Sequence, residues 1–581
     1  LRKGMVVYMK KIGDINPCLK GYASDPRTRR YLSPVRIVRS YGNVSGTENL
    51  IGDKACQITL GGGEDVCTLS NSKGCSERAG ILLDYGTEIS GSARIMVFGV
   101  SGRTGRADLH IKFGESVSEA LSDLGEKNSC CDHANRDEII NVGFLSANET
   151  NESGFRFVYL ELIGEDVTVS LKAVQAVFIF RDLEYRGSFE CSDSLVNKIW
   201  QTAAYTAHLN MQEYLWDGIK RDRLVWIGDM QTEVMTIASV FGYSDIVPRS
   251  MDLVRDETPV GTWMNGISSY SLWWIFLQYD FYMSYGDYPY LLKQREYMTS
   301  LLSLLCEYVG DDGAEKLPES RFIDWPNSEN EEAKHAGLQS MLLMAMERGA
   351  FICDILGEYD ISDKCRKSVE NLSRHRPSAG GSKQAASLMV CAGLADAEKT
   401  NSEILSVGGA RGFSTFLGYY TLSAIAKSGD YDGAIEAMKQ YWGGMLEMGA
   451  TTFWEDFNID WMENSGRIDE PVPEGKRDIH GDFGAYCYLG FRHSLCHGWA
   501  SGPVPYLAQT VLGVKVTSPG TRSIDIVPHL GSLEYVNGSY PTPHGDICIS
   551  HIRRDDGSIE TKVELPPHWR KTGEFSYEYI G

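Results

Sequence analysis

The segment DGIKRDRLVWIGD, which ends at Asp229, concentrates side chains that could carry out acid–base chemistry. It places the carboxylates of Asp217, Asp222 and Asp229 beside arginines and Trp226, in what looks like a connection between two helices. Far downstream, Glu455 follows an aromatic pair in GATTFWEDF. Two carboxylates brought together from distant positions are the minimum apparatus for general acid and general base catalysis on an acetal. The two segments together therefore predict a catalytic site.

Each carboxylate also has an ordinary alternative role. Asp229 precedes a predicted helix and could be its N-cap. Asp222 lies between two arginines, as in a solvated salt-bridge cluster. Asp217 is followed by Gly218, which is a normal turn composition. Taken together, these roles leave unexplained why tryptophans alternate with the charges. Glu455, embedded in aromatic residues, is either paired or has its pKa raised by desolvation.

Composition narrows the range of partners. The net charge of -22 and the isoelectric point near 5.1 argue against nucleic acid or an anionic membrane surface, because phosphate binding needs clustered lysine and arginine. No run of 18 apolar residues occurs, so we expect no membrane span. The first residues, LRKGMVVYMKK, are basic but lack the apolar core and cleavage site of a signal peptide. The compartment stays open: periplasmic or secreted if a signal peptide has been removed, and cytoplasmic otherwise.

Neither a metal nor an organic cofactor is expected. The 14 cysteines include no CxxC pair, which argues against a zinc ribbon or a thioredoxin-like centre. Cys130, Cys131 and His133 stand together in SCCDH and could suggest a metal site, but a polar loop with incidental thiols is the simpler interpretation. The run GGARGFSTF, which begins at Gly408, lacks the preceding strand and the final GKS or GKT of a phosphate-binding loop, so we expect no nucleotide site.

The hydrophobic pattern changes twice along the chain, which at 581 residues is too long for a single core. From about Gly46 to Ile179, short alternating or β-branched runs such as QITL, ARIMVFGV and FVYLELI are separated by turn residues, which predicts a β-sandwich. From about Cys191 to Leu512, apolar residues recur at steps of three and four, which predicts roughly ten to twelve helices. So many helices favour a closed α/α toroid.

After Pro519 the pattern returns to β, with hairpin-like turns expected at the sequences NG and DDG. We therefore expect an N-terminal β-sandwich region over residues 1–185, a helical catalytic region over 186–515 and a C-terminal β-sandwich domain over 516–581. The two segments that carry the candidate catalytic carboxylates, DGIKRDRLVWIGD and GATTFWEDF, both fall in the helical region.

Three motifs, DGIKRDRLVWIGD, GATTFWEDF and SLCHGWASGPVPYL, together resemble those of glycoside hydrolase family 78, the α-L-rhamnosidases. The order of β-sandwich, helical toroid and C-terminal β-domain is similar too, and the resemblance runs from about Leu82 to the end of the chain. It implies a multidomain fold in which an (α/α)6 barrel is flanked by β-sandwich domains. It also implies hydrolysis of α-L-rhamnosides with inversion at the anomeric carbon. The expected partner is a rhamnose-containing oligosaccharide or glycoside.

The resemblance assigns roles to individual residues. Asp222 stands where the family has its general-acid Glu, and Glu455 stands as the general base. The shorter aspartate withdraws the acid by about one methylene, although it remains chemically competent. The substrate-binding residues that the resemblance implies are Asp217, Arg221, Trp226, Asp229, Trp274, Asp324, Trp325, Trp454 and His497.

Ordinary roles stay open for the weaker candidates. His497 could be a core histidine, and Trp274 could serve helix packing. Asp324 and Trp325, in FIDWPN, could form a turn before a proline.

Two other functions also stay open. A different (α/α)6 enzyme, such as a hydrolase of another sugar or a polysaccharide lyase, would fit the fold. A lyase, however, needs a Tyr, His or Lys base and a basic patch for its uronate. A glycan-binding protein without activity would fit the exchange of Glu for Asp at position 222. Turnover of p-nitrophenyl α-L-rhamnoside discriminates among these functions.

Overall fold

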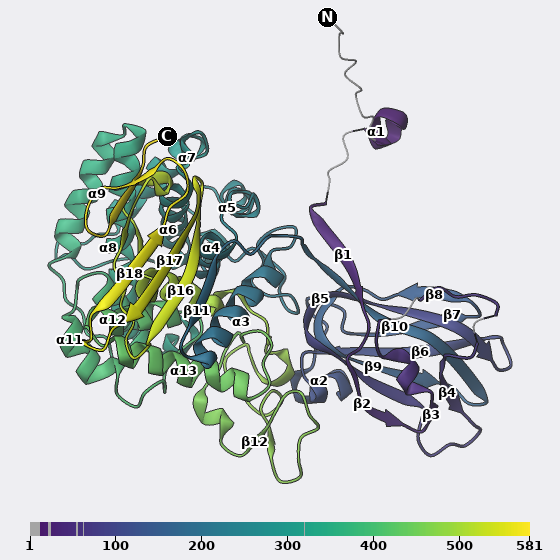
Figure 1. The fold of residues 1–581 in the computed structure, drawn as a ribbon. Coiled ribbons are helices and arrows are strands. Elements are labelled where there is room, and N and C mark those ends of the chain that lie inside the picture. The colour runs from purple at the N-terminus through teal and green to yellow at the C-terminus, as the bar shows by residue number, and fades with distance from the viewer. Residues whose placement is uncertain (1–11, 21–24, 54–55, 62, 319) are drawn as a thin grey trace, which may run out of the picture.

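The structure, a computed structural model, describes residues 12–20, 25–53, 56–61, 63–318 and 320–581. The N-terminal strands form one body and a large group of helices forms another, with the C-terminal strands lying against the helices (Figure 1). Residues 1–11, on which the signal-peptide prediction rests, lie outside the described ranges. Within those ranges, no helix combines the length and the hydropathy that a bilayer crossing requires.

The N-terminal strands pair antiparallel in one ten-stranded sheet. The strands are β1 (Arg27–Leu32), β2 (Arg36–Tyr41), β3 (Asn43–Ser45), β4 (Cys67–Asn71), β5 (Gly80–Ser101), β6 (Arg106–Gly114), β7 (Asp137–Gly143), β8 (Ser146–Glu149), β9 (Ser153–Ile163) and β10 (Val167–Arg181). The main path runs β3-β4-β10-β5-β9-β6-β7, while β1 pairs with β10 and both β2 and β8 pair with β5. Alternate apolar residues of β5, β9 and β10 fill a shared core, as the period-2 pattern predicted.

One predicted strand is wrong. The run QITL, residues 57–60, forms no strand, and Leu60 is 80% exposed. The run has no partner among the described strands, so its alternation has no sheet face to bury. The long runs ARIMVFGV and FVYLELI, by contrast, lie in β5 and β9, where both neighbouring edges are paired.

The central region is helical, as the three- and four-residue periodicity predicted. Its helices are α3 (Ser194–Asn210), α4 (Met230–Val240), α5 (Ile246–Glu257), α6 (Ser268–Tyr285), α7 (Tyr288–Glu307), α8 (Glu331–Leu356), α9 (Tyr359–Leu372), α10 (Lys383–Cys391), α11 (Ala397–Thr400), α12 (Gly418–Lys427), α13 (Tyr431–Glu447) and α14 (Pro503–Tyr506). Capping residues set several boundaries. Gly286 ends α6 in the left-handed region, and the adjacent Asp287 accepts a hydrogen bond from the Tyr290 N–H at the start of α7.

Alternate helices contact one another in a ring. The contacts run from α4 to α6, α8, α10, α12 and α14, and α14 contacts α4 again. Most of α6 is buried and apolar on all faces, whereas α9, outside the ring, is amphipathic with a charged face. The loops that precede α4, α6, α8 and α14 lie close together, because residues from all four of them line one cavity.

The C-terminal part consists of two four-stranded antiparallel sheets. The first is formed by β11 (Ser188–Cys191), β16 (Tyr535–Thr542), β17 (Gly545–Arg553) and β18 (Ile559–Glu564). The second is formed by β14 (Val514–Val516), β15 (Ser523–Ile526), β20 (Ser576–Tyr579) and β19 (Trp569–Lys571). Although β11 precedes the helices in the sequence, it pairs with β16 near the end of the chain.

The turn predicted at NG is wrong, whereas the turn predicted at DDG is confirmed. Asn537 and Gly538 lie inside β16, and this strand turns into β17 only after Thr542. A Cβ on Gly538 would lie 2.4 Å from the Ser188 carbonyl oxygen, so the glycine permits the close approach of β11 instead of making a turn. The DDG sequence does separate β17 from β18.

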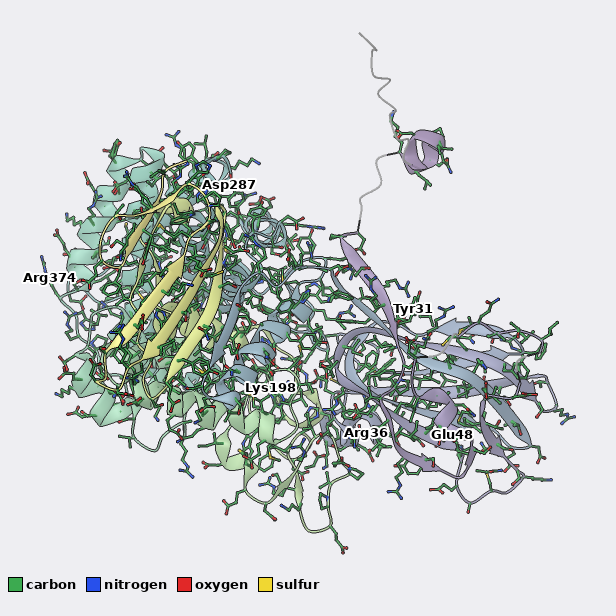
Figure 2. All side chains as sticks on the ribbon, viewed as in Figure 1. Tyr31, Arg36, Glu48, Lys198, Asp287 and Arg374 are labelled. Atoms are coloured by element: carbon green, nitrogen blue, oxygen red, sulfur yellow. The ribbon has the colours of Figure 1, made fainter. Side chains whose placement is uncertain are left out.

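The N-terminal sheet packs against the segment that follows α13. Arg36 Nη1 in β2 lies 2.8 Å from Glu470 Oε1, and Figure 2 shows Arg36 on the side of the sheet that faces the helical body. The buried Arg156 of β9 donates to the Gly449 carbonyl at 3.1 Å and pairs with Asp84 at 2.9 Å. The segment that carries the GATTFWEDF motif is therefore held between the two bodies.

Candidate active site

A cavity of about 340 Å³ lies at the end of the ring where the loops before α4, α6, α8 and α14 meet. Eight of the predicted site residues line it: Asp217, Arg221, Asp222, Trp226, Asp229, Trp325, Glu455 and His497. The rest of the lining comprises Gly266, Ile267, Tyr270, Ser320, Arg321, Phe322, Cys487, Tyr488 and Trp499. Four carboxylates from two distant motifs thus converge on one cavity.

The loop of residues 217–229, which we call the acid loop, is closed on itself by hydrogen bonds. The Asp217 N–H donates to the Leu224 carbonyl at 3.1 Å, and Asp217 Oδ1 accepts from the Leu224 N–H at 3.0 Å. Asp222 and Arg223, at the tip, both have φ of 57°. A left-handed backbone at two successive residues that are not glycine costs free energy, and such strain persists only where surrounding contacts fix it.

The acid loop presents Asp222 to the cavity, with one carboxylate oxygen that accepts a hydrogen bond and one that has only longer ion-pair contacts. Trp226 Nε1 donates to Asp222 Oδ2 at 3.0 Å. Asp222 Oδ1 lies 3.4 Å from Arg221 Nη1 and 3.1 Å from His133 Nε2, which comes from the N-terminal sheet region. With 14% of its side chain exposed, Asp222 does not belong to the solvated surface cluster considered as its alternative role.

Glu455 is held more rigidly than Asp222. Its backbone N–H donates to the Ser494 carbonyl at 2.9 Å, and its own carbonyl accepts from Thr415 Oγ1 at 2.5 Å and from Trp499 Nε1 at 2.9 Å. Its carboxylate accepts from the Ser494 N–H at 3.1 Å and pairs with Arg221. Burial raises the pKa of Glu455, while the Arg221 guanidinium and the Ser494 N–H act in the opposite direction.

Arg221 joins the two candidate catalytic carboxylates. Its Nη1 faces Asp222 and its Nη2 binds Glu455 Oε1. Because one planar guanidinium contacts both, the facing oxygens of Asp222 and Glu455 can be no more than about 9 Å apart. A sugar ring and one water molecule bridge separations of roughly 6.5–9.5 Å in inverting glycosidases. The two carboxylates therefore lie close enough to act on one glycosidic bond.

Asp217, Asp229 and His497 form the buried floor of the cavity. His497 Nε2 lies 3.8 Å from Asp217 Oδ2 and from Asp229 Oδ2, and 3.6 Å from Glu455 Oε1. Burial raises the pKa of Asp217 and of Asp229, and the charge of Asp229 raises that of Asp217 further. Burial, followed by the charge of Arg221, lowers the pKa of His497 well below its usual range. Neutral carboxyl and imidazole groups of this kind can both donate and accept hydrogen bonds.

Asp229 stands at the N-cap position of α4 but makes no capping bond with its side chain. Its Oδ1 instead accepts from the Tyr270 hydroxyl at 2.8 Å. Asp229 therefore occupies the N-cap position that the sequence suggested, but its side chain does not cap the helix and lines the cavity instead.

Two groups of side chains could hold a metal ion among the residues that the structure describes. In the cavity, Asp217, Asp229 and His497 offer ligand atoms within 4.8 Å of one another. The second group, Glu115, Glu119 and His480, is already occupied, because Lys220 Nζ lies 2.9 Å from Glu115 and 3.2 Å from Glu119. In neither group does a further observation point to a metal.

Three predicted site residues do not line the cavity. Trp274 is fully buried, donates to the Met251 carbonyl at 3.3 Å and packs edge-on against Tyr297. Trp454 is also fully buried, and its ring packs edge-on against Phe457. Both tryptophans serve helix and loop packing, which was the alternative considered for Trp274.

Asp324 supports the cavity wall from behind. Its carboxylate accepts from the Ser414 hydroxyl and, at 2.7 Å, from the N–H of Trp325, whose ring does line the cavity. Burial raises the pKa of Asp324 to about 7, although the hydrogen bond from Ser414 acts in the opposite direction. Asp324 thus contacts the backbone of Trp325 but does not itself line the cavity.

The raised pKa of Asp324 predicts a pH-dependent contribution to stability. Between about pH 4 and pH 7 the folded state binds a proton at Asp324 that the unfolded chain has released, so this contribution is present at low pH and is lost as the pH rises toward 7. Asp324→Asn removes the effect. We therefore expect the unfolding free energy of the variant, relative to the unaltered protein, to increase from pH 4.5 to pH 7.5 by on the order of a few kcal/mol.

Urea unfolding at the two pH values measures this difference. An Asp311→Asn variant, which changes an exposed carboxylate, serves as the control and should show no such increase. A difference between Asp324→Asn and the unaltered protein that is the same at both pH values would contradict the assignment.

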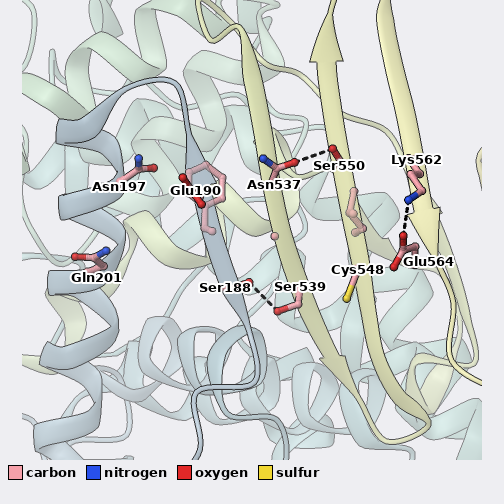
Figure 3. Close-up of a pocket in the computed structure, with 13 residues that line it drawn as sticks. Ser188, Glu190, Asn197, Gln201, Asn537, Ser539, Cys548, Ser550, Lys562 and Glu564 are labelled. Carbon is pink, nitrogen blue, oxygen red and sulfur yellow. Dashed lines mark hydrogen bonds and ion pairs between the residues drawn. The ribbon is translucent and has the colours of Figure 1, made fainter.

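A larger hollow of about 720 Å³ lies on the C-terminal sheet beside α3 (Figure 3). Its charged side chains include Glu190 and the ion pair of Lys562 with Glu564 at 2.5 Å. Phe189 is the one aromatic residue in this lining, and no predicted site residue contributes to it. The hollow thus lacks the converging carboxylates of the smaller cavity.

Several residues of the candidate site were missed from the sequence. Tyr270 lies in ISSYSLWW and Ser494 in SLCHGWASG, so both stand inside segments that had drawn attention for other residues. Tyr488, whose ring lies 5.1 Å from the Arg221 guanidinium carbon, gave no signal of its own. His133 was interpreted as part of an incidental loop, although its imidazole reaches Asp222.

The comparisons with known families agree with the motif resemblance. The family model for the bacterial alpha-L-rhamnosidase 6 hairpin glycosidase domain matches residues 184–375. A curated alpha-L-rhamnosidase of Alteromonas sp. (strain LOR) is 32% identical over 127 residues, which make up 22% of this chain and 11% of the relative. The predicted resemblance to the α-L-rhamnosidases is therefore confirmed over these segments, and residues 184–375 are similar to a glycosidase domain of that family.

Three solved rhamnosidases share the fold. The glycoside hydrolase family 78 rhamnosidase of Bacillus sp. GL1 has a TM-score of 0.72 at 21% identity, over 90% of this chain and 54% of that one. The rhamnosidase from Klebsiella oxytoca with rhamnose bound has a TM-score of 0.63 at 19% identity, over 84% and 96% of the two chains. The Streptomyces avermitilis alpha-L-rhamnosidase complexed with L-rhamnose has a TM-score of 0.66 at 17% identity, over 86% and 51%. This chain thus spans about half the length of the Bacillus and Streptomyces proteins.

Proposed function

We propose that this protein is an inverting glycoside hydrolase that removes terminal α-L-rhamnose from glycosides or polysaccharides. The observation that carries the proposal is the contact of one arginine, Arg221, with both Asp222 and Glu455 in a single cavity. The family match of the surrounding segment and the rhamnose-bound relatives favour rhamnose as the sugar.

In this proposal Asp222 is the general acid and Glu455 the general base. Asp222 donates a proton to the glycosidic oxygen as the bond from that oxygen to C1 breaks. Glu455 accepts a proton from the water that attacks C1 from the opposite face. Burial raises the pKa of Glu455, and the pairing with Arg221 and the Ser494 N–H opposes that effect in favour of the ionised form that a general base needs.

The remaining cavity residues suit a 6-deoxy sugar. The floor of Asp217, Asp229 and His497 offers donors and acceptors for neighbouring hydroxyls. The rings of Trp226 and Trp325 are apolar walls against which a methyl group and the C–H face of a pyranose can pack.

We also propose that the ring of contacts from α4 through α14 is the inner layer of an (α/α)6 barrel, with α3, α5, α7, α9, α11 and α13 outside it. The closure of the contact path from α14 back to α4 supports this arrangement. We further propose that the chain divides into an N-terminal region, residues 1–185, a helical region, residues 186–515, and a C-terminal domain, residues 516–581. Strand β11 lies within the middle range but pairs with a strand of the C-terminal sheet. The β-rich parts on either side are proposed to be sandwiches.

The competing functions are less well supported by the cavity. A lyase would need a free basic patch, but Arg221 is paired with two carboxylates and Arg321 with Glu315. A glycan-binding protein without activity would not need Glu455 to be fixed by backbone and side-chain hydrogen bonds at once.

Proton NMR of the reaction with p-nitrophenyl α-L-rhamnoside tests both the activity and its stereochemistry. We expect hydrolysis in which the first sugar detected is the β anomer, because a single displacement by water inverts C1. The p-nitrophenyl glycosides of other sugars, run alongside, should be turned over far more slowly. An initial α anomer would mean a covalent intermediate on Glu455, and binding without turnover would favour the glycan-binding alternative.

A further inference from the structure

The N-terminal sheet region contacts the acid loop at residues before and after Asp222. Lys220 Nζ lies 2.9 Å from Glu115 Oε2, just beyond the end of β6, and both side chains are buried. Arg223 Nη1 donates to the Glu152 carbonyl, between β8 and β9, at 3.2 Å. Because Lys220 and Arg223 lie on either side of Asp222, the conformation of the loop tip depends on the N-terminal region.

A third contact reaches the candidate acid itself. His133, in the loop before β7, places Nε2 at 3.1 Å from Asp222 Oδ1. This carboxyl oxygen is shielded from solvent and accepts no hydrogen bond from any described donor. A buried oxygen without a donor is destabilising unless it carries a proton or faces a group that does. One proton held between Oδ1 and Nε2 satisfies both atoms.

Each of the two carboxylates near His133 is paired with an arginine. Asp132 Oδ2 lies 3.4 Å from the same Nε2, and it also lies 3.1 Å from the Arg492 guanidinium. Cys130 Sγ donates to Asp132 Oδ1 at 2.6 Å. On the other side, Arg221 is the cation nearest to Asp222. The imidazole therefore faces two carboxylates, each of which already has an arginine.

The immediate partners of Asp222 oppose its role as an acid. Arg221 and the Trp226 N–H both offer donors to Asp222 and neither can supply it with a proton, whereas a general acid must be protonated when each turnover begins. His133 is 28% exposed, so it can exchange protons with solvent while it touches the buried Asp222 oxygen. Histidine is the side chain best suited to exchange a proton near neutral pH.

We propose that His133, from the N-terminal sheet region, is a positioning residue that shares a proton with Asp222 and restores one to it after each turnover. The proposal rests on the proposed hydrolase function. During the displacement, Asp222 gives its proton to the glycosidic oxygen, which leaves C1 with the bonding electron pair. Water forms the new bond to C1 and releases a proton to Glu455. Afterwards His133 passes a proton from Nε2 to Asp222 Oδ1 and regains one from bulk water, while Glu455 releases its proton to water.

The kinetic test compares two leaving groups in a His133→Gln variant. We expect kcat/KM for methyl α-L-rhamnoside, whose leaving group needs protonation, to fall by about 10- to 100-fold. For p-nitrophenyl α-L-rhamnoside, which needs little protonation, it should stay within about threefold. The pH dependence of the methyl rhamnoside reaction should change shape, because a glutamine cannot titrate.

A His110→Gln variant is the matched control. His110, in β6, also pairs with a carboxylate, Asp137 at 2.6 Å, but unlike Asp222 this carboxylate does not line the cavity. It should leave both substrates unaffected. An equal slowing of the two substrates by His133→Gln, or no slowing of either, would overturn the proposal, because a merely structural residue does not discriminate between leaving groups.

A second measurement does not depend on hydrolysis. In protein labelled with ¹⁵N-histidine, the ring resonances that disappear in His133→Gln identify His133, and we expect Asp222→Asn to move these resonances at a fixed pH, because an asparagine cannot share a proton with Nε2. Unmoved resonances would overturn the shared proton even if rhamnosides are hydrolysed. If the unaltered protein hydrolyses no rhamnoside, the proposed function fails, and moved resonances would still establish the coupling of the two residues.

Discussion

Glu455→Gln is expected to reduce the hydrolysis of every α-L-rhamnoside, whatever its leaving group, by about 10³-fold or more. All substrates need the attacking water, and the amide of glutamine cannot take its proton. Glutamine has nearly the same shape, so it can keep the hydrogen bond from the Ser494 N–H and the three backbone contacts that hold position 455. The loss should therefore appear in kcat, with little change in KM.

The measurement is kcat for methyl and p-nitrophenyl α-L-rhamnosides, with thermal unfolding as a check of the fold. Glu463→Gln, which changes an exposed carboxylate in the segment following Glu455, is the control and should behave like the unaltered protein. If Glu455→Gln retained activity, or lost it on one of the two substrates alone, Glu455 would not be the base.

Asp222→Asn should separate the acid from the base. We expect it to slow methyl α-L-rhamnoside by about 10² to 10⁴-fold and p-nitrophenyl α-L-rhamnoside much less, because the activated leaving group departs without a proton. The pattern differs from that of Glu455→Gln, where both substrates should be slowed alike. A set of aryl rhamnosides of graded leaving-group acidity, assayed with both variants, measures the difference.

Asp222→Glu is the conservative counterpart and restores the residue usual in the resembling family. Activity should stay within about tenfold if the shorter acid is only a variation in reach. Should Asp222→Asn leave methyl rhamnoside hydrolysis intact, the acid is another residue, and Asp217 and Asp229 are the remaining carboxylates of the acid loop in the cavity.

The acid loop and Glu455 could be predicted because short stretches of sequence contain the residue types that mark them. Charged residues that alternate with tryptophans have no stable place on an ordinary surface, so DGIKRDRLVWIGD and GATTFWEDF stand out without any knowledge of the fold. The periodicity predicted the helices: each predicted segment that shows clear three- and four-residue steps, such as DMQTEVMTIASVFG, contains a helix, although several of these segments extend beyond it.

The errors concern residues whose role depends on what packs against them. Trp274 lies in α6, which is apolar on all faces, so no pattern distinguishes a side chain that faces the cavity from one that faces α5 and α7. Gly538 has the composition of a turn, but its purpose is the approach of a strand distant in the sequence. His133 acquires its role only when the N-terminal sheet docks on the acid loop, and no short-range pattern encodes that docking.

The pairing of β11 with β16 constrains how the chain can reach its native state during synthesis. A ribosome releases Ser188–Cys191 before the helices α3 to α14, but the partner strand, Tyr535–Thr542, emerges only after all of them. The hydrogen-bonding edge of β11 therefore has no partner strand while the helical region is being synthesised. A strand pairing across such a long sequence separation also forms slowly. We infer that the helical region completes its folding late, and that loss of the strands after Pro519 would leave β11 as an exposed edge prone to aggregation.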